Sequence, residues 1–352
     1  MDDVKSTPDT TRSTVDLNAP LAISQGDPSG IGPEIALKAW LLRKPDDTPF
    51  FVLGDPDHLK RLATELGLPI PVERCEPSQA RAIFRTALPV VALSTAIAGE
   101  PGKPDRRDAA GTIEAIERGV ELVRSGAASA IVTNPISKDV LYQAGFHHPG
   151  HTEFLGELSM RFWNVEAQPV MMLWSPQLAV VPVTIHVSIA RVLTELTRDL
   201  IVETARITAQ DLTRRFGIAR PRLAVAGLNP HAGENGSMGR EEIDFIRAAV
   251  DDLRALDIDA RGPLPADTMF HADARARYDA AICMYHDQAL IPIKTLAFDS
   301  AVNTTLGLPF IRTSPDHGTA YDIAGKGVAN PASLIAALDL ATKLVQAQAK
   351  SR

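Results

Sequence analysis

The chain has 352 residues, of which 45% are hydrophobic and 22% charged, a globular composition that excludes a wholly disordered or fibrous protein. Its 43 acidic and 36 basic residues give a net charge of −7, and no dense basic run offsets it. This balance argues against binding to nucleic acid or to an anionic membrane surface, and the length predicts about two domains.

Residues 1–18 are rich in Asp, Ser and Thr and lack the apolar core of a signal peptide, so we expect a disordered lead-in. No apolar run approaches the ~20 residues that span a bilayer. The two cysteines, Cys75 and Cys283, form no CxxC motif or disulfide framework, which suits a reducing compartment. We therefore expect a cytoplasmic protein that does not bind membranes.

After residue 18, short apolar runs alternate with stretches of helical periodicity. Unbroken Val, Ile, Ala and Leu runs are typical of strands buried on both faces of a parallel sheet. The predicted strands cover residues 21–24, 50–53, 89–93, 128–133, 169–173, 178–184, 222–227, 280–284 and 291–298. The predicted helices cover residues 33–42, 109–124, 152–162, 198–216, 241–256 and 331–347. This alternation predicts an α/β architecture, and no linker separates two domains.

Three histidines each follow a predicted strand: His186, His231 and His286. Ligands of open α/β sheets bind at the carboxyl ends of the strands, so the three imidazoles could hold a divalent metal with positions open for a substrate. The gaps between them are long and there is no HExxH motif, so structural, hydrogen-bonded histidines are an equal alternative.

Other polar residues follow strands or interrupt apolar runs. The Gly-rich turn 26–34 could present N–H groups to an anion or be a tight structural turn; it matches neither GxGxxG nor a P-loop, which argues against a Rossmann dehydrogenase. Lys138 either binds an anion or is a surface lysine. His151 and Thr152 begin a predicted helix. They either form an anion site at its N-terminus, or Thr152 is simply the N-cap residue and His151 a loop residue. Lys294 and Arg312 flank an apolar stretch that includes Asn303, and their partner is an anionic ligand or one of Asp287, Asp299 and Asp316.

Taken together, these motifs resemble those of the 4-hydroxythreonine-4-phosphate dehydrogenases of pyridoxal phosphate biosynthesis. The resemblance covers roughly residues 20–345, in order. Ser188 and Asn235 depart from it, where relatives often have Pro and Gly, but neither is a predicted ligand. The matching segments are 26–34 (GDPSGIGPE), 150–154 (GHTEF), 228–234 (LNPHAGE), 262–268 (GPLPADT), 285–288 (YHDQ) and 305–313 (TLGLPFIRT).

The resemblance implies two α/β/α domains around a cleft, similar to isocitrate and isopropylmalate dehydrogenases and not a Rossmann fold. We expect one domain over residues 19–145 plus 303–350 and a second over 146–302. It implies a homodimer with the metal site at the subunit interface. The residues carried over are His186, His231 and His286 for the metal, and His151, Thr152, Lys294, Asn303 and Arg312 for the substrate.

The implied reaction is the oxidation of 4-(phosphooxy)-L-threonine with NAD⁺ or NADP⁺, followed by loss of carbon dioxide. The implied metal is zinc, magnesium or cobalt, and the residues that contact the nicotinamide cofactor are not identified. Asp267 is the candidate general base, with a structural loop carboxylate as its alternative. Alternative functions are a related dehydrogenase acting on phospho-threonate, phospho-erythronate or a cis-dihydrodiol carboxylate, a metal-dependent hydrolase or lyase, and a two-lobed binding protein.

Overall fold

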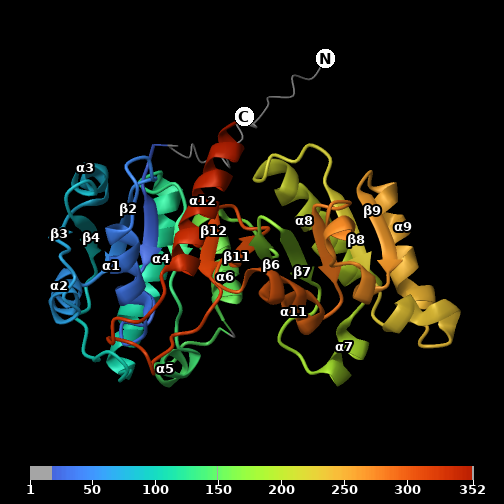
Figure 1. Ribbon diagram of the computed structural model, residues 1–352, viewed down its shortest axis with the longest axis horizontal. Helices are drawn as coiled ribbons and strands as arrows, with labels where there is room; N and C mark the ends of the chain where they lie inside the picture. Colours follow the sequence, from blue (N-terminus) through green and yellow to red (C-terminus); the bar gives the residue numbers. More distant parts are fainter. Residues whose placement is uncertain (1–17, 149, 351–352) are drawn as a thin grey trace, which may run out of the picture.

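The computed structural model describes residues 18–148 and 150–350, so the predicted lead-in lies, apart from Asn18, outside the described residues (Figure 1). Within these residues, twelve strands form a single sheet in the order β3-β4-β2-β1-β5-β12-β11-β6-β7-β10-β8-β9. Their bounds are β1 Leu21–Ser24, β2 Phe50–Gly54, β3 Val72–Arg74, β4 Leu88–Ala92, β5 Ile131–Thr133, β6 Val170–Ser175, β7 Leu178–Pro182, β8 Arg222–Ala226, β9 Asp259–Leu264, β10 Ala280–Cys283, β11 Val302–Leu306 and β12 Arg312–Pro315.

The sheet consists of two parallel halves that run in opposite directions. Neighbouring strands from β3 to β12 are all parallel, and so are those from β7 to β9. Between them, β11 pairs antiparallel with both β12 and β6, and β6 pairs antiparallel with β7. The middle strands therefore join the two halves and reverse the strand direction between them.

Helices cover both faces of the sheet (Figure 1). Their bounds are α1 Gly32–Leu41, α2 Pro56–Glu65, α3 Ala80–Ile83, α4 Ala109–Ser125, α5 Lys138–Gln143, α6 His151–Trp163, α7 Ile189–Glu195, α8 Arg198–Arg214, α9 Arg247–Ala255, α10 Ala272–Arg275, α11 His286–Ala297 and α12 Ala332–Lys350. The 3-10 helices are η1 Pro77–Gln79, η2 Arg106–Asp108, η3 Pro230–Gly236 and η5 Ala266–Thr268, and η4 Glu242–Ile246 is a π-helix. No helix in the described ranges is long and apolar enough to cross a membrane.

Four hydrophobic clusters fill the space between the sheet and these helices. In the first half, one cluster joins strands to α1, α2 and α12, and another joins them to α4 and α6. Ile23 belongs to the first and its neighbour Ala22 to the second, because successive strand residues point to opposite faces. In the second half, α8 and α9 cover one face and α11 the other. Burial on both faces explains why these strands read as unbroken apolar runs.

The predicted α/β class is confirmed, but the predicted strand at 291–298 is wrong. Those residues lie almost entirely in α11. Its apolar run and its internal Pro292 are not typical of a helix, which explains the wrong prediction. The buried residues Leu290, Ile293 and Ala297 are spaced by three and four, the period of a helix, while Ile291 is 64% exposed. The prediction also omitted the strands β3, β9, β11 and β12.

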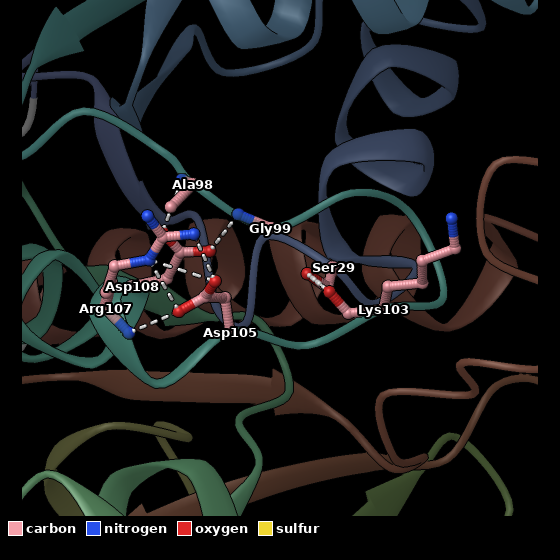
Figure 2. A network of polar contacts seen from close by, with 7 residues as sticks. All are labelled: Ser29, Ala98, Gly99, Lys103, Asp105, Arg107 and Asp108. Atoms are coloured by element: carbon pink, nitrogen blue, oxygen red, sulfur yellow. Dashed lines mark hydrogen bonds and ion pairs between the residues drawn. The ribbon is translucent and has the colours of Figure 1, made fainter.

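Side chains of the Gly-rich turn after β1 bind both the turn itself and distant parts of the chain. Asp27 accepts a bond from the Ser29 N–H at 2.9 Å and from the Tyr321 hydroxyl at 2.6 Å. Gly26 has a φ of +72°, and a Cβ there would lie 2.5 Å from the Pro135 carbonyl oxygen, so the turn needs glycine. Figure 2 shows that the Ser29 hydroxyl also bonds the Lys103 carbonyl at 3.0 Å. These contacts fix the end of β1 against the end of β5.

The loop between β4 and α4 is held by the same network (Figure 2). The buried Asp108 carboxylate accepts from the N–H groups of Ala98 at 2.7 Å and Gly99 at 2.9 Å. Asp105 and Arg107 form a neighbouring ion pair at 2.6 Å. The side chains of Asp27, Ser29 and Asp108 thus all bind other parts of the protein. These contacts favour the interpretation of the Gly-rich segment as a tight structural turn.

Candidate active site

A cavity of about 470 Å³ lies where the two halves of the sheet meet. Its walls come from the ends of β5 and β12, the start of α6, the segment after β7, and α11. Seven predicted ligands line it: His151, Thr152, His186, His286, Lys294, Asn303 and Arg312. Residues that are far apart in the sequence therefore share one space, although His231 and Asp267 do not line it.

Arg312 is the most unusual group in this cavity. It is 4% exposed, yet within the described part of the chain no acidic side chain pairs with it. Its guanidinium donates instead to the hydroxyls of Thr133, at 2.7 and 3.0 Å, and Thr305, at 3.0 Å. Burial lowers the pKa of Arg312 to about 10. The Asn303 side-chain oxygen also accepts from this guanidinium, at 3.3 Å. A buried cation held only by neutral groups is suited to binding an anion.

Lys294 has a different environment, since its ammonium pairs with Asp316 at 2.9 Å. Of the three carboxylates considered from sequence, Asp316 is thus the partner. Asp287 lies 2.7 Å from Nδ1 of His286 instead. The charge of Lys294 is therefore already balanced by a carboxylate, whereas the charge of Arg312 is not.

His151 and Thr152 form the first turn of α6, and the N-cap residue is Gly150. The alternative role of Thr152 as N-cap is therefore wrong. Nε2 of His151 is buried without a hydrogen-bond partner among the described residues. Burial, with the charges of Arg312 and Lys138, holds the pKa of His151 well below its usual value, so this imidazole is neutral. A neutral ring with an unused nitrogen at a helix N-terminus can bind a polar ligand.

His186 and His286 face each other, with ring centroids 5.8 Å apart. They follow β7 and β10, which are neighbouring parallel strands. Burial, followed by the charges of Lys138 and His286, lowers the pKa of His186 and favours the neutral imidazole. Asp287 occupies Nδ1 of His286, which leaves Nε2 for another partner, an arrangement common among metal-binding histidines.

His231 follows β8, the next strand beyond β10, but its exposed side chain lies outside the cavity. It sits in η3, where φ is positive at six consecutive residues, from His231 to Gly236. Left-handed backbone costs roughly 1–2 kcal/mol per non-glycine residue, so the surrounding structure must hold this loop. Asp267 is exposed in η5, which contacts η3.

The donor set fits a divalent metal in chemistry, with two imidazoles in place and a third on the adjacent strand end. Within residues 18–148 and 150–350, however, no three His, Cys, Asp or Glu side chains converge to hold an ion.

Several cavity residues were not among the predicted ligands. Thr133 accepts hydrogen bonds from Arg312, and Asp316 pairs with Lys294; Thr305, which does not line the cavity, also accepts from Arg312. Thr133 could be suspected because it ends a strand, but its pairing with Arg312 depends on β5 and β12 being neighbours. Lys138, left open from sequence, and His317 also line the cavity.

Fold and cavity together are those of an α/β protein with a pocket suited to a small anionic ligand. A family model described as "Pyridoxal phosphate biosynthetic protein PdxA" matches residues 46–341. A 4-hydroxythreonine-4-phosphate dehydrogenase from Bradyrhizobium diazoefficiens is 59% identical over 338 residues, covering 94% of this chain and 98% of the relative. The chain therefore belongs to the PdxA family.

Solved structures agree with this assignment. A 4-hydroxythreonine-4-phosphate dehydrogenase from Klebsiella pneumoniae is 36% identical with a TM-score of 0.82, covering 93% of this chain and 100% of that one. A terephthalate 1,2-cis-dihydrodiol dehydrogenase from Burkholderia xenovorans is more distant, 27% identical with a TM-score of 0.63, covering 92% of this chain and 98% of that one.

Proposed function

We propose that the chain is a 4-hydroxythreonine-4-phosphate dehydrogenase of pyridoxine 5′-phosphate biosynthesis. It oxidises the C3 hydroxyl of 4-(phosphooxy)-L-threonine with NAD⁺ or NADP⁺. The product, 2-amino-3-oxo-4-(phosphooxy)butanoate, loses carbon dioxide to give 3-amino-2-oxopropyl phosphate. The relatives named for this activity support the proposal. The observation that carries it is Arg312, a buried cation without a carboxylate partner in the described chain, because the substrate is an anion at both ends.

Arg312, Lys294, Asn303, His151 and Thr152 would bind the phosphate and carboxylate of this substrate. Arg312 supplies uncompensated charge, and Lys294 supplies a donor aimed by Asp316. His151, as a neutral imidazole, contributes a hydrogen bond without a second charge. Fixing both ends would orient the C3 hydroxyl toward the histidines.

His186, His231 and His286 would hold the divalent metal, zinc, magnesium or cobalt. Such an ion supplies positive charge that lowers the pKa of the substrate hydroxyl and favours the later decarboxylation. Neutral imidazoles leave that charge undiminished, and the lowered pKa of His186 keeps its ring neutral. Asp267, on the turn that contacts the His231 loop, is our candidate to accept the hydroxyl proton.

We also propose a homodimer whose interface completes this site. His231 lies outside the cavity, and large apolar side chains are exposed on the segments that follow the other two histidines in sequence. They are Ile189 (66%) and Leu193 (60%) on α7, Ile291 (64%) on α11, and Phe298 (74%) just after α11.

The domain division is part of the same proposal: residues 19–145 plus 303–350 in one domain and 146–302 in the other. The division of the core into two pairs of clusters supports two domains, with α6 packed in a cluster of the first half. A cytoplasmic location is likewise proposed, supported by two buried free cysteines.

A second candidate keeps the scaffold and changes the substrate to phospho-threonate, phospho-erythronate or a cis-dihydrodiol carboxylate. The likeness to a dihydrodiol dehydrogenase favours it. The cluster of anion-binding groups in the cavity favours a phosphorylated substrate over an unphosphorylated diol.

The test is formation of reduced nicotinamide by the purified chain with 4-(phosphooxy)-L-threonine and NAD⁺ or NADP⁺, with and without a chelator. We expect turnover that the chelator abolishes and added metal restores. No turnover with metal supplied, alongside turnover of phospho-threonate or a dihydrodiol carboxylate, would replace the first proposal by the second. Turnover in metal-stripped protein would refute the role of the three histidines.

A further inference from the structure

The three strand ends that carry the histidines are tied together by a buried polar network. β7, β10 and β8 are adjacent in the sheet, and Met284 follows the central one. On one side, the Thr184 hydroxyl donates to the Met284 carbonyl at 2.8 Å. On the other side, the Gln288 side chain accepts from the Met284 N–H at 2.6 Å and donates to the Gly227 carbonyl at 2.8 Å.

Gln288 is the central member of this network. It is only 8% exposed, and its carbonyl and amino groups each bond a different strand end. It lies two residues after His286, and Gly227 lies four residues before His231. The bridge requires one acceptor and one donor on a single short side chain. A carboxamide supplies both on separate atoms, whereas an ionised glutamate lacks the donor and an apolar residue lacks both.

The network continues from Gly227 into the strained loop. The Glu242 carboxylate, 1% exposed, accepts from the Asn229 backbone N–H at 2.8 Å and from its side-chain amide at 3.0 Å. A Cβ at Gly227 would lie 2.9 Å from Cα of Ala232, so the loop packs directly on the strand end that Gln288 holds. The position of His231 is therefore set from β8. The pairing of β8 with β10 ends before Gly227 and Met284, and beyond that point Gln288 joins the two strand ends.

We infer that Gln288 is a positioning residue for metal binding: it fixes the two strand ends that present His286 to the cavity of its own chain and His231 to the site that the dimer completes. This inference rests on the proposed function, because it concerns the proposed metal-binding histidines. Gln288 touches neither metal nor substrate, and it acts through the backbone at Met284 and Gly227. Partners outside the ligand shell typically change metal affinity 10–100-fold when they are altered.

The experiment measures Co²⁺ affinity of the metal-stripped full chain by competition with a chromophoric chelator, with the visible spectrum of bound Co²⁺ as a second readout. Gln288→Glu keeps the bond from Met284 and loses the one to Gly227. We expect affinity to fall on the order of 10–100-fold, with a changed Co²⁺ spectrum. Thr208→Val is the matched control, because it loses a buried side-chain bond of 2.7 Å on α8 in the same half of the sheet.

Thr184→Val gives the second arm, because it removes the tie on the other side of Met284 and keeps the side chain's shape. A backbone bond from Thr184 to Met284 remains at 3.3 Å, so we expect a fall at the lower end of that range. The inference is overturned if Gln288→Glu binds Co²⁺ with the same affinity as Thr208→Val. If Gln288→Glu does not fold, the same comparison is made with Thr184→Val.

Failure of the inference is distinguishable from failure of the proposed metal site. His231→Ala removes a proposed ligand, so it should bind Co²⁺ far more weakly than any positioning variant. If His231→Ala binds like the unaltered chain, the proposed ligand set is wrong and the inference falls with it. If His231→Ala loses the metal while Gln288→Glu retains full affinity, the ligand set stands and only the role of Gln288 is refuted.

Discussion

Two buried arginines show how local partners separate a binding role from a structural one. Arg215 is 7% exposed and bonds Asp211 at 3.4 Å and the Leu308 carbonyl. Arg312 is equally buried but has threonine hydroxyls where Arg215 has a carboxylate. Removing one partner of a buried ion pair lowers the free energy of unfolding. A buried charge without a partner itself lowers that free energy, and binding an anionic ligand offsets the loss.

We therefore expect opposite results from the same substitution at these two positions. Arg312→Met should leave the free energy of unfolding unchanged or raise it, because it removes an uncompensated buried charge. The same variant should raise the substrate KM on the order of 10–100-fold and leave the cofactor KM unchanged, since charged hydrogen bonds contribute about 1.5–3 kcal/mol. Urea unfolding and steady-state kinetics measure both.

Arg215→Met is the matched control. It leaves the buried carboxylate of Asp211 without its cation, so unfolding free energy should fall by about 3–5 kcal/mol. A large stability loss in Arg312→Met, or an effect confined to the cofactor KM, would contradict the substrate role of Arg312.

At the scale of elements, the sequence predicted those strands and helices whose apolar pattern is local. The runs at β1, β2, β8 and β10 were found because their residues are buried on both faces. β11 and β12 were missed because polar side chains such as Asn303 and Arg312 point into the cavity. α11 was mistaken for a strand because its Pro292 and apolar residues hid the helical spacing. Elements that build the site thus departed most from simple patterns.

One pair of charges joins two elements that are distant in sequence, α1 and the segment before α12. Glu34, fully buried, bonds Lys38 at 2.7 Å and the Ala329 N–H at 3.0 Å. Lys38 also donates to the carbonyls of Gly327 and Ala329, each at 2.8 Å. The pair therefore holds the segment 327–329 against α1.

Lys38→Met should lower the free energy of unfolding by about 3–5 kcal/mol, because Glu34 would remain charged and buried without its cation. The double variant Glu34→Gln with Lys38→Met should recover part of that loss, as measured by urea unfolding. Lys60→Met is the control: it breaks an exposed pair with Asp57, so its effect should stay within ~1 kcal/mol. Equal losses in Lys38→Met and the double variant would refute the account.

At the scale of the molecule, sequence reasoning chose residues that share one cavity, although it could not place them. Seven predicted ligands line that cavity because both halves of the sheet direct strand ends toward it. Their mutual contacts could not be predicted, since Arg312 meets Thr133 only through the pairing of β12 with β5. Nor could the position of His231 be predicted, because it depends on a left-handed loop.

The exposed position of His231 gives a prediction for the assembly. If a second chain completes the site, weakening the interface should weaken metal binding even though no ligand is altered. Leu193→Lys combined with Ile291→Lys places charges on the exposed apolar side chains of α7 and α11, outside the cavity lining. We expect sedimentation equilibrium to shift from twice the chain mass toward the single-chain mass.

Co²⁺ affinity should fall in parallel with that dissociation and recover at higher protein concentration, because mass action restores the dimer. Leu42→Lys is the control, since Leu42 is 60% exposed at the end of α1 in the other half of the sheet. A variant that stays dimeric would show that α7 and α11 are not the interface. A variant that dissociates yet binds Co²⁺ with unchanged affinity would show that one chain completes the metal site, with the His231 loop moving toward the cavity.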